Sequence, residues 1–315
     1  MSEGGPGYRT YVTYQLQPDE STQDGLRRCA REQLDEAIAQ LGTGVNDDPV
    51  EAVHEARKSL KKTRSLLRLS RGTLDPDERR RENAALRDAG RELSAARDAE
   101  VMLEATDELA ERFAGRVPQA TFDAIRRHLE AGRDPARRRL MESGLTGQVA
   151  EELKADRARI DDWPLRRAGW KALEPGLHRS YARGRAGLGQ ARSHPTAENL
   201  HDWRKRTKDL WYHLRLLKPS APGIVGGAAK EADKLSKLLG DDHDLAVLHE
   251  TLEHSARELK VDLDAVLELI DHRREQLQAE AIVLGQRLYA ERPKAFVARI
   301  RRYWKASRTQ AVAHA

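Results

Sequence analysis

Apolar residues recur every three or four positions along most of the 315-residue chain, which is the spacing of one helix face. Prolines that start helices and glycines that end them divide this pattern into eight segments. We predict helices over 22–41, 49–71 and 76–113, a fourth from Pro118, and then, after DDWPLRRAGW, helices over 175–191, from Pro195, to about Leu259 and to about Lys305. The third should break near 96–98, and the fourth should kink or split near Pro135 and Gly144. Only YRTYVTYQL, residues 8–16, alternates like a strand, and we interpret it as an extended arm.

Residues 53–71, VHEARKSLKKTRSLLRLSR, predict an amphipathic helix whose polar face carries mostly positive charge. At about 100° per residue, a histidine and several cations gather on that face, with leucines opposite. They are His54, Arg57, Lys58, Lys61, Lys62, Arg64 and Arg68. Like charges at this spacing repel by a few tenths of a kcal/mol per pair, so a helix that needed only solubility would mix its signs. For this helix taken alone, a solvated basic face is the alternative to an anion-binding face.

The same pattern occurs a second time, at Leu200–Leu216, LHDWRKRTKDLWYHLRL. His201, Arg204, Lys205, Lys208 and Arg215 align with His54, Arg57, Lys58, Lys61 and Arg68. GLRR at 25–28 resembles GLHR at 176–179, and ELSAARDAEVML at 92–103 resembles LLGDDHDLAVLH at 238–249. Three matched segments in one order predict an internal duplication, and hence an all-α fold of two pseudo-symmetric four-helix bundles. We assign 1–18 to a leader, 19–165 and 166–305 to the two bundles, and 306–315 to a tail.

Composition limits the classes of function. Charged residues make up 34% of the chain and aromatic residues 5%, while the net charge is only +5, so the basic character is local. A single cysteine, Cys29, excludes an internal disulfide framework and a thiolate metal cluster. No apolar run approaches the roughly 18 residues of a membrane span, and MSEGGPGYRT lacks the apolar core of a signal peptide. We therefore expect a soluble cytoplasmic protein without a membrane partner.

The doubled basic helix resembles the mark of the CHAD domain, the conserved histidine α-helical domain, which has H-x-x-R-K-x-x-K in each of two four-helix bundles. The matching residues are His54-Arg57-Lys58-Lys61 with Arg64, and His201-Arg204-Lys205-Lys208 with Tyr212. The resemblance covers about 11–305. It implies binding of inorganic polyphosphate in a basic channel between the bundles, no catalysis, no cofactor, and association with polyphosphate granules. The second basic helix has Asp209 where the first has Lys62, and Trp211 where the first has Arg64. We therefore expect fewer phosphate contacts from the second half.

We assign polyphosphate contacts to the thirteen residues of the two basic helices. They are His54, Arg57, Lys58, Lys61, Lys62, Arg64, Arg68, His201, Arg204, Lys205, Lys208, Tyr212 and Arg215. Arginines can fork onto phosphate oxygens and lysines act as point charges. We place both histidines at helix starts, where they would bind more strongly as the pH falls, with helix capping or packing as the alternative.

A further set of residues is assigned to a secondary lining, with a solvated surface position as the alternative for each. They are Arg28, Arg91, Arg179, Tyr181, Arg183, Lys237 and Arg302. Asp98 and Asp244 occupy matched positions. Each either orients an Arg or His of a basic helix or caps the break in the third helix. We favour the structural role. The sequence does not specify the polyphosphate length, the oligomeric state or a protein partner.

Three other functions compete with polyphosphate binding. A metal site is suggested by histidines beside acids at His54, His201 and His243, but no HExxH or Cys/His spacing occurs and the surrounding cations oppose a divalent ion. A phosphohydrolase would need acids such as DDHD at 241–244, and GIVGGAAK lacks the Walker spacing. Binding of single-stranded nucleic acid usually uses aromatic side chains that stack on the bases, and aromatic residues are scarce in this chain. We therefore expect a binding protein and not an enzyme.

Overall fold

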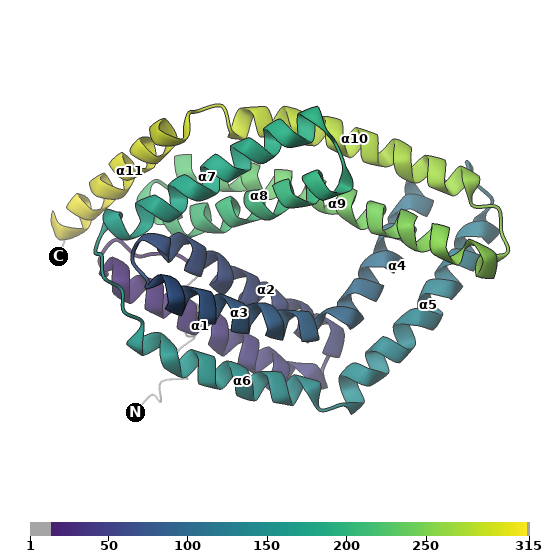
Figure 1. Ribbon diagram of the computed structural model, residues 1–315, viewed down its shortest axis with the longest axis horizontal. Coiled ribbons are helices and arrows are strands. Elements are labelled where there is room, and N and C mark those ends of the chain that lie inside the picture. Colours follow the sequence, from purple (N-terminus) through teal and green to yellow (C-terminus); the bar gives the residue numbers. More distant parts are fainter. Residues whose placement is uncertain (1–13, 314–315) are drawn as a thin grey trace, which may run out of the picture.

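The computed structural model describes residues 14–313, apart from the side chains of 95–97, 136, 141 and 311–313. This part of the chain contains eleven α-helices and no β-strand, which confirms the all-α class (Figure 1). The first half comprises α1 (Thr22–Gly42), α2 (Pro49–Leu69), α3 (Pro76–Glu92), α4 (Ser94–Arg112), α5 (Gln119–Glu142) and α6 (Leu145–Arg159). The second comprises α7 (Trp170–Ser193), α8 (Ala197–Leu217), α9 (Ile224–Leu259), α10 (Asp264–Leu288) and α11 (Pro293–Ala313).

Side-chain caps fix the starts of the helices that matter most for the site. The Asp48 carboxylate accepts hydrogen bonds from the backbone N–H groups of Val50 and Glu51 at 3.0 and 3.1 Å, at the first turn of α2. Thr196 accepts from the N–H of Asn199 at 3.2 Å at the first turn of α8. Each cap satisfies donors that the helix itself leaves unpaired. The caps therefore engage two first-turn N–H groups of α2 and one of α8.

Helix boundaries differ from the prediction at three places. The break expected near 96–98 falls at Leu93, and the last predicted helix is divided into α10 and α11. Gly144, with a φ of 67°, separates α5 from α6 as expected, whereas Pro135 stays inside α5. As a result each half has more than the four helices predicted, and α11 runs to Ala313, so most of the segment assigned as a tail is helical.

The described end of the predicted arm lies between the two basic helices. Tyr14 donates its hydroxyl to the Lys62 carbonyl of α2 at 2.8 Å, and the N–H of Leu16 donates to the Leu216 carbonyl of α8 at 2.9 Å. The remainder of the arm, residues 8–13, lies outside the described residues. Tyr14 and Leu16 are both buried, so this short segment joins the halves through the core.

Both hydrophobic cores contain residues from both halves. The larger core takes leucines from α1, α2 and α6 to α9, among them Leu26, Leu60, Leu177, Leu210 and Leu235. The smaller core lies where α4 and α5 meet the end of α9 and the start of α10, at the right of Figure 1; it includes Phe122, Ile125, Leu248 and Ile270. Burial of these apolar faces against each other holds the halves together. Among residues 14–313, none of the helices combines the length and hydrophobicity needed to cross a membrane.

Candidate functional site

The two basic helices contact each other at a buried polar junction. His213 and Ser65 are fully buried, and their polar atoms meet where the Nε2 of His213 lies 2.9 Å from the Ser65 carbonyl. The Ser65 hydroxyl donates to the Asp209 carbonyl at 3.3 Å. Arg68 donates to the Asp209 carboxylate at 3.0 Å. Because α2 and α8 are joined at these points, the cations along the two helices are held at fixed relative positions.

Four cations of α2 and α8 form an electropositive group, which we call the central cluster: Arg57, Lys61, Arg204 and Lys208. Restricted hydration among the surrounding helices is the main cause that lowers the pKa of Lys61 to about 7, and the positive charges of the other three lower it further. Lys61 still has an exposed side chain, as expected where solvent reaches it from one direction. Burial, followed by the charge of Arg204, lowers the pKa of Lys208 to about 8. The cluster is therefore a place where the free protein tolerates positive charge poorly.

The two arginines of the central cluster are held in place by the neighbouring helices. Arg57 donates to the Leu93 carbonyl at 3.1 Å, at the break between α3 and α4, and lies 3.7 Å from Asp98. Asp98 therefore forms an ion pair with Arg57, and the helix break lies earlier, at Leu93. The guanidinium of Arg204 packs on α9 at Gly240, where an added Cβ would lie 3.2 Å from its Nη2. Each arginine is consequently positioned before any ligand arrives.

The histidine at the start of the second motif packs against another histidine. The ring centroids of His201 and His243 lie 4.0 Å apart, with the ring planes tilted by 35°. Burial, followed by the proximity of His243 and Lys205, lowers the pKa of His201 to about 4. Burial also lowers the pKa of His243, with Arg204 as the next cause. His201 is therefore neutral at physiological pH in the free protein.

The expectation that the histidines start their helices is wrong. α2 begins at Pro49 and α8 at Ala197, so His54 and His201 each lie at least a full turn inside. The first-turn N–H groups belong to the caps described above. In the free protein the depressed pKa of His201 keeps this ring neutral through the ordinary histidine range, and the expected strengthening of binding as the pH falls stays a prediction.

A second group of cations surrounds Trp211. The Nζ of Lys208 and the guanidinium carbon of Arg215 lie 5.6 and 5.3 Å from the centre of its indole ring, within the range of cation–π attraction. Lys62 belongs to this group. Burial, followed by the charge of the neighbouring Arg215, lowers the pKa of Lys62 to about 8. Lys58 also contributes to that shift and pairs with Glu55 at 2.7 Å.

The remaining predicted cations of the two helices have protein partners. Arg64 lies 3.4 Å from the Asn83 side chain, and burial, followed by the charge of Arg68, lowers its pKa to about 10. Lys205 donates to Asp202 at 2.9 Å on the exposed surface of α8. An exposed pair of this kind contributes little to stability and is readily opened by a competing anion.

Two predicted tyrosines belong to the core and do not line a surface. Tyr212 is 2% exposed, and its ring stacks on Trp211 at 4.6 Å between centroids. Tyr181 is fully buried, and its hydroxyl donates to the Leu288 carbonyl at 3.2 Å. Helical spacing alone does not distinguish the flank of a polar face from the edge of the apolar one, and for both residues the apolar edge is the correct assignment.

Among the secondary cations, Arg28 is also structural. Its guanidinium pairs with Glu20 at 2.6 Å and with Glu32 at 3.0 Å, and it donates to the Gln15 carbonyl at 2.7 Å. These contacts hold the described start of the chain against α1. The other secondary cations are exposed; they are Arg91, Arg179, Arg183, Lys237 and Arg302.

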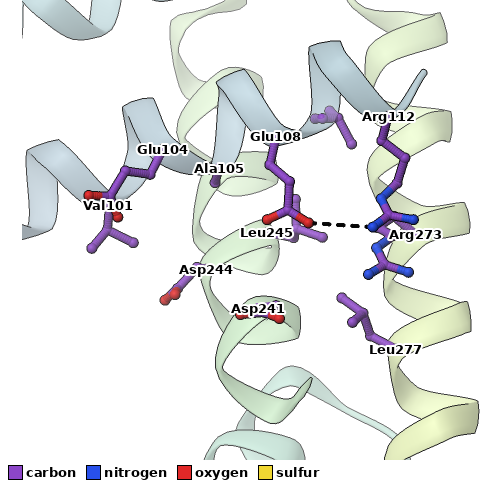
Figure 2. Close-up of a pocket in the computed structure, with 11 residues that line it drawn as sticks. Val101, Glu104, Ala105, Glu108, Arg112, Asp241, Asp244, Leu245, Arg273 and Leu277 are labelled. Atoms are coloured by element: carbon purple, nitrogen blue, oxygen red, sulfur yellow. Dashed lines mark ion pairs between the residues drawn. The ribbon is translucent and has the colours of Figure 1, made fainter. Parts of the chain in front are cut away.

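An acidic pocket adjoins the central cluster. It has a volume of about 120 Å³ and lies between α4, α9 and α10, with acidic side chains from α4 and α9 and two arginines at one end (Figure 2). The acids are Glu104, Glu108, Asp241 and Asp244, and the arginines are Arg112 and Arg273. Burial, followed by the charges of Glu108 and Asp244, raises the pKa of Asp241 to about 6. Within the described residues no group of three or more His, Cys, Asp or Glu side chains is arranged to hold a metal ion.

Asp244 links the pocket to the basic helices. Its negative charge raises the pKa of Lys208, opposing the burial that lowers it. The acid therefore lies close enough to favour the charged ammonium.

Sequence reasoning missed two arginines next to this site. Arg206 donates to the Asp209 carboxylate at 3.3 Å, and its matched position in the first basic helix is Ser59, so the repeat gives no signal for it. Arg71 follows Arg68 by three residues and continues its spacing just beyond the end of α2, so a signal for it is present in the sequence.

A family model described as "CHAD domain" matches residues 28–253 of the chain. Two curated relatives are the uncharacterized proteins MT2285 and Rv2226 of Mycobacterium tuberculosis, from strains CDC 1551 and H37Rv. Each is 29% identical over 241 residues, which is 73% of this chain and 45% of the relative. The chain therefore spans about half the length of the curated relatives it matches.

Two solved structures are similar in fold. PptA from Streptomyces chartreusis has a TM-score of 0.61 and 17% identity, covering 86% of this chain and all of that one. The CHAD domain from the plant Ricinus communis has a TM-score of 0.50 and 20% identity, covering 96% of this chain and 98% of that one. At these identities the similarity establishes the helical fold.

Proposed function

The chain belongs to the CHAD domain family, and we propose that it binds inorganic polyphosphate along the cations of α2 and α8 without catalysing a reaction on it. The observation that carries the proposal is the central cluster. Its two lysines have depressed pKa values because poor hydration, and after it the neighbouring cations, disfavour their charge. A polyanion supplies the missing negative charge, so binding relieves a repulsion that is present in the free protein.

The chemistry of the ligand fits this arrangement. Polyphosphate is a flexible chain with about one negative charge per phosphate, without bases or sugars to recognise. Successive turns of a helix rise about 5.4 Å, so a row of cations along one helix can contact phosphates along an extended chain. Arg57 and Arg204 are already fixed by α4 and α9 and can each offer forked N–H donors, while the lysines act as mobile point charges.

Nucleic acid fits less well, because its bases require stacking surfaces. In the described residues the indole nearest to the cations is that of Trp211, and Tyr212, Lys208 and Arg215 already lie against it. Single-stranded nucleic acids gain much of their affinity from bases stacked on aromatic rings. We therefore propose recognition of a backbone charge alone.

Binding without catalysis is supported by the chemistry of the acidic pocket. Phosphoryl transfer uses acids that hold metal ions beside the phosphates. Here Glu108 pairs with Arg112 at 3.7 Å, and Arg273 acts on Asp241 as a counter-charge. The acids of this pocket are therefore partly neutralised by arginines. Attachment to polyphosphate granules in the cell would follow from this binding, and we include it in the proposal.

The test is a titration with polyphosphates of defined length. The variant Lys61→Gln/Lys208→Gln should lose affinity by about 100-fold, because two charge-assisted contacts contribute together about 3 kcal/mol. The matched control is Lys154→Gln/Lys171→Gln, which changes the net charge equally at two exposed lysines on α6 and α7. Its affinity should stay within about threefold of the unmodified protein after screening.

Length dependence separates the competing functions. Affinity should rise with chain length and then level off, while orthophosphate and ATP compete poorly. Saturation at two or three phosphates, dependence on added metal, or release of orthophosphate would indicate a catalytic pocket instead. Equal affinity for single-stranded RNA of matched charge would reduce the function to general polyanion binding. Equal losses in the two double variants would place the site elsewhere.

A further inference from the structure

The helix α7 lies in direct backbone contact with the end of α2. At Gly176 an added Cβ would be 2.0 Å from the Leu69 carbonyl oxygen, so only glycine permits this approach. On the opposite side of the contact, a Cβ at Gly72 would lie 2.5 Å from the ring of Pro175. Two small residues thus bring α7 against the turn that follows α2.

This contact gathers arginines from five segments. The segments are α2, the turn after it, α3, α7 and α8. We call these residues the arginine surface: Arg68, Arg71, Arg79, Arg179, Arg183 and Arg206. Burial is the main cause that lowers the pKa of Arg71, followed by the charges of Arg79, Arg179 and Arg183. The pKa of Arg206 is lowered by burial and, among the cations, by the charges of Arg183 and Arg68. The members of the surface are therefore near neighbours.

Acids close to the arginine surface are mostly engaged elsewhere. On α3, Glu82 pairs with Arg159 at 2.9 Å, and Asp75, the cap of α3, pairs with Arg166 at 2.9 Å. Asp209 is the carboxylate that contacts the surface directly, through Arg68 and Arg206. Asp202 on α8 also lies near Arg206, but it already pairs with Lys205 at 2.9 Å. The six guanidinium groups therefore outnumber the acids near them. A surface that only needed solubility would not place so many like charges together.

We propose that the arginine surface is a second anion-binding surface, which receives the part of a long polyphosphate chain that extends beyond the central cluster. The inference rests on the proposed function and specifies the path of the ligand. Arg57, Lys61, Arg64 and Arg68 form one row along α2 that starts at the central cluster, and Arg71, in the turn after α2, continues it to the arginine surface. Over the 14 steps from Arg57 to Arg71 the row spans roughly 21 Å at about 1.5 Å per residue.

The composition of the surface suits the outer part of such a path. All six members are arginines, whose planar groups bind phosphate oxygens in pairs and keep their charge at any physiological pH. By contrast, the central cluster contains lysines with lowered pKa values, whose charged form a bound anion would favour. The arginine surface can therefore attract and hold a long chain from outside, while the central cluster binds its inner part.

The test compares two triple variants with chains of different length. The first, Arg71→Ala/Arg79→Ala/Arg179→Ala, removes three cations from the arginine surface. The control, Arg127→Ala/Arg137→Ala/Arg138→Ala, removes three exposed arginines from α5 with the same change in net charge. Affinities for tripolyphosphate and for a long polyphosphate are measured at two salt concentrations. Alanine preserves the helices, because its helix propensity is at least that of arginine.

For the first variant we expect unchanged binding of tripolyphosphate and about tenfold weaker binding of the long chain. The slope of log affinity against log salt should become shallower by about 2, since each lost contact contributes about 0.7 for a flexible chain. Equal long-chain affinity in the two triple variants would overturn the inference, and so would equal loss of tripolyphosphate binding. A larger loss for single-stranded RNA than for polyphosphate would also overturn it. Failure of the proposed function is distinct, because the unmodified protein would then bind neither phosphate chain.

Discussion

Where α2 has Lys62, the matched position of α8 has Asp209, and the two side chains act oppositely on their arginine neighbours. Asp209 pairs with Arg68 and Arg206, which neutralises part of the charge at that point. Lys62 lies beside Arg215 instead, and burial together with that charge lowers its pKa to about 8. The same motif position thus gives an attractive contact at Asp209 and a repulsive contact at Lys62.

The helices that precede the two basic helices differ in the opposite sense. In α1, Arg28 has Glu32 one turn later and pairs with it. In α7, the matched Arg179 has Arg183 at that place, so a pair of opposite charges becomes a pair of like charges. Positive charge without a matched acid therefore lies at Lys62 in the first half and at Arg179 and Arg183 of the arginine surface in the second. The matched sequence motifs of the two halves therefore carry different charges.

The largest difference between the halves is expected at Gly176 and its match, Gly25. Gly176→Ala would force a Cβ against the Leu69 backbone at 2.0 Å, which cannot move without shifting α2. At Gly25 the nearest atoms are the side-chain ends of Glu20 and Leu16, at 2.5 and 2.9 Å, and these can rotate away. Gly176→Ala should lower the free energy of unfolding by about 3 kcal/mol, and Gly25→Ala by no more than about 1 kcal/mol. Chemical denaturation measures both.

Equal losses in the two glycine variants would mean that the halves tolerate contact alike, and the comparison would fail. Gly189→Ala on the same helix as Gly176 is the control, because an added Cβ there meets nothing within 4 Å. It should be neutral or stabilising, since alanine is the better helix former by about 1 kcal/mol.

The cations of the two basic helices could be predicted from sequence because helical spacing fixes which residues share a face. Arg57, Lys61, Arg204 and Lys208 follow from the repeated motif, and the structure places all four together. The pairing of α2 with α8 depends on Ser65 and His213, which are buried, and no local pattern reveals that they meet across the two halves.

The arginine surface was only partly predictable for the same reason. Arg179 and Arg183 lie on one face of their helix, but their approach to Arg71 depends on a glycine that touches the backbone of another helix. Tyr181 and Tyr212 were placed wrongly, since a tyrosine at the border of two faces can turn to either. Long-range packing decided these cases, and spacing within a single helix carries no information about it.

The exchange of charge at Lys62 and Asp209 predicts opposite effects for two single substitutions. Asp209→Asn removes the counter-charge of Arg68 and Arg206, so polyphosphate affinity should rise about threefold while the free energy of unfolding falls by about 2 kcal/mol. Lys62→Met removes a repelled cation, so affinity should fall about threefold and the free energy of unfolding should rise by several tenths of a kcal/mol. Isothermal titration and thermal unfolding of both variants provide the four numbers.

Effects of the same sign in both variants would contradict the assignment of an attractive contact to Asp209 and a repulsive contact to Lys62. Lys58→Met serves as the control, because Lys58 lies on the same helix but already has Glu55 as a partner at 2.7 Å. Removing it should change the free energy of unfolding less than removing Lys62, since a favourable pair is lost together with a repulsion.

The smallest expected effect distinguishes the lysines of the central cluster from the arginines of the arginine surface by their pH dependence. The folded-state pKa of Lys61 is about 7, whereas an unfolded lysine titrates near 10.4. Between these values the unfolded chain binds a proton that the folded protein has released, so the free energy of unfolding rises with pH across this window. Below pH 7 both states are protonated and the repulsion is fully present. Because Lys61 is partly exposed, the rise should stay below about 1 kcal/mol.

Binding should show the reverse dependence, because a bound phosphate chain restores the charge of Lys61. Affinity for tripolyphosphate should therefore increase as the pH falls from 9 to 6, with net proton uptake measured by titration in buffers of different ionisation enthalpy. Lys61→Arg keeps a cation at every pH in this range, so its affinity curve should be flatter while binding is retained. A curve that keeps its full slope in Lys61→Arg would assign the proton to another group. The triple variant of the arginine surface should keep the full slope, because the arginines stay charged throughout, and this separates the two regions by a readout that does not depend on affinity alone.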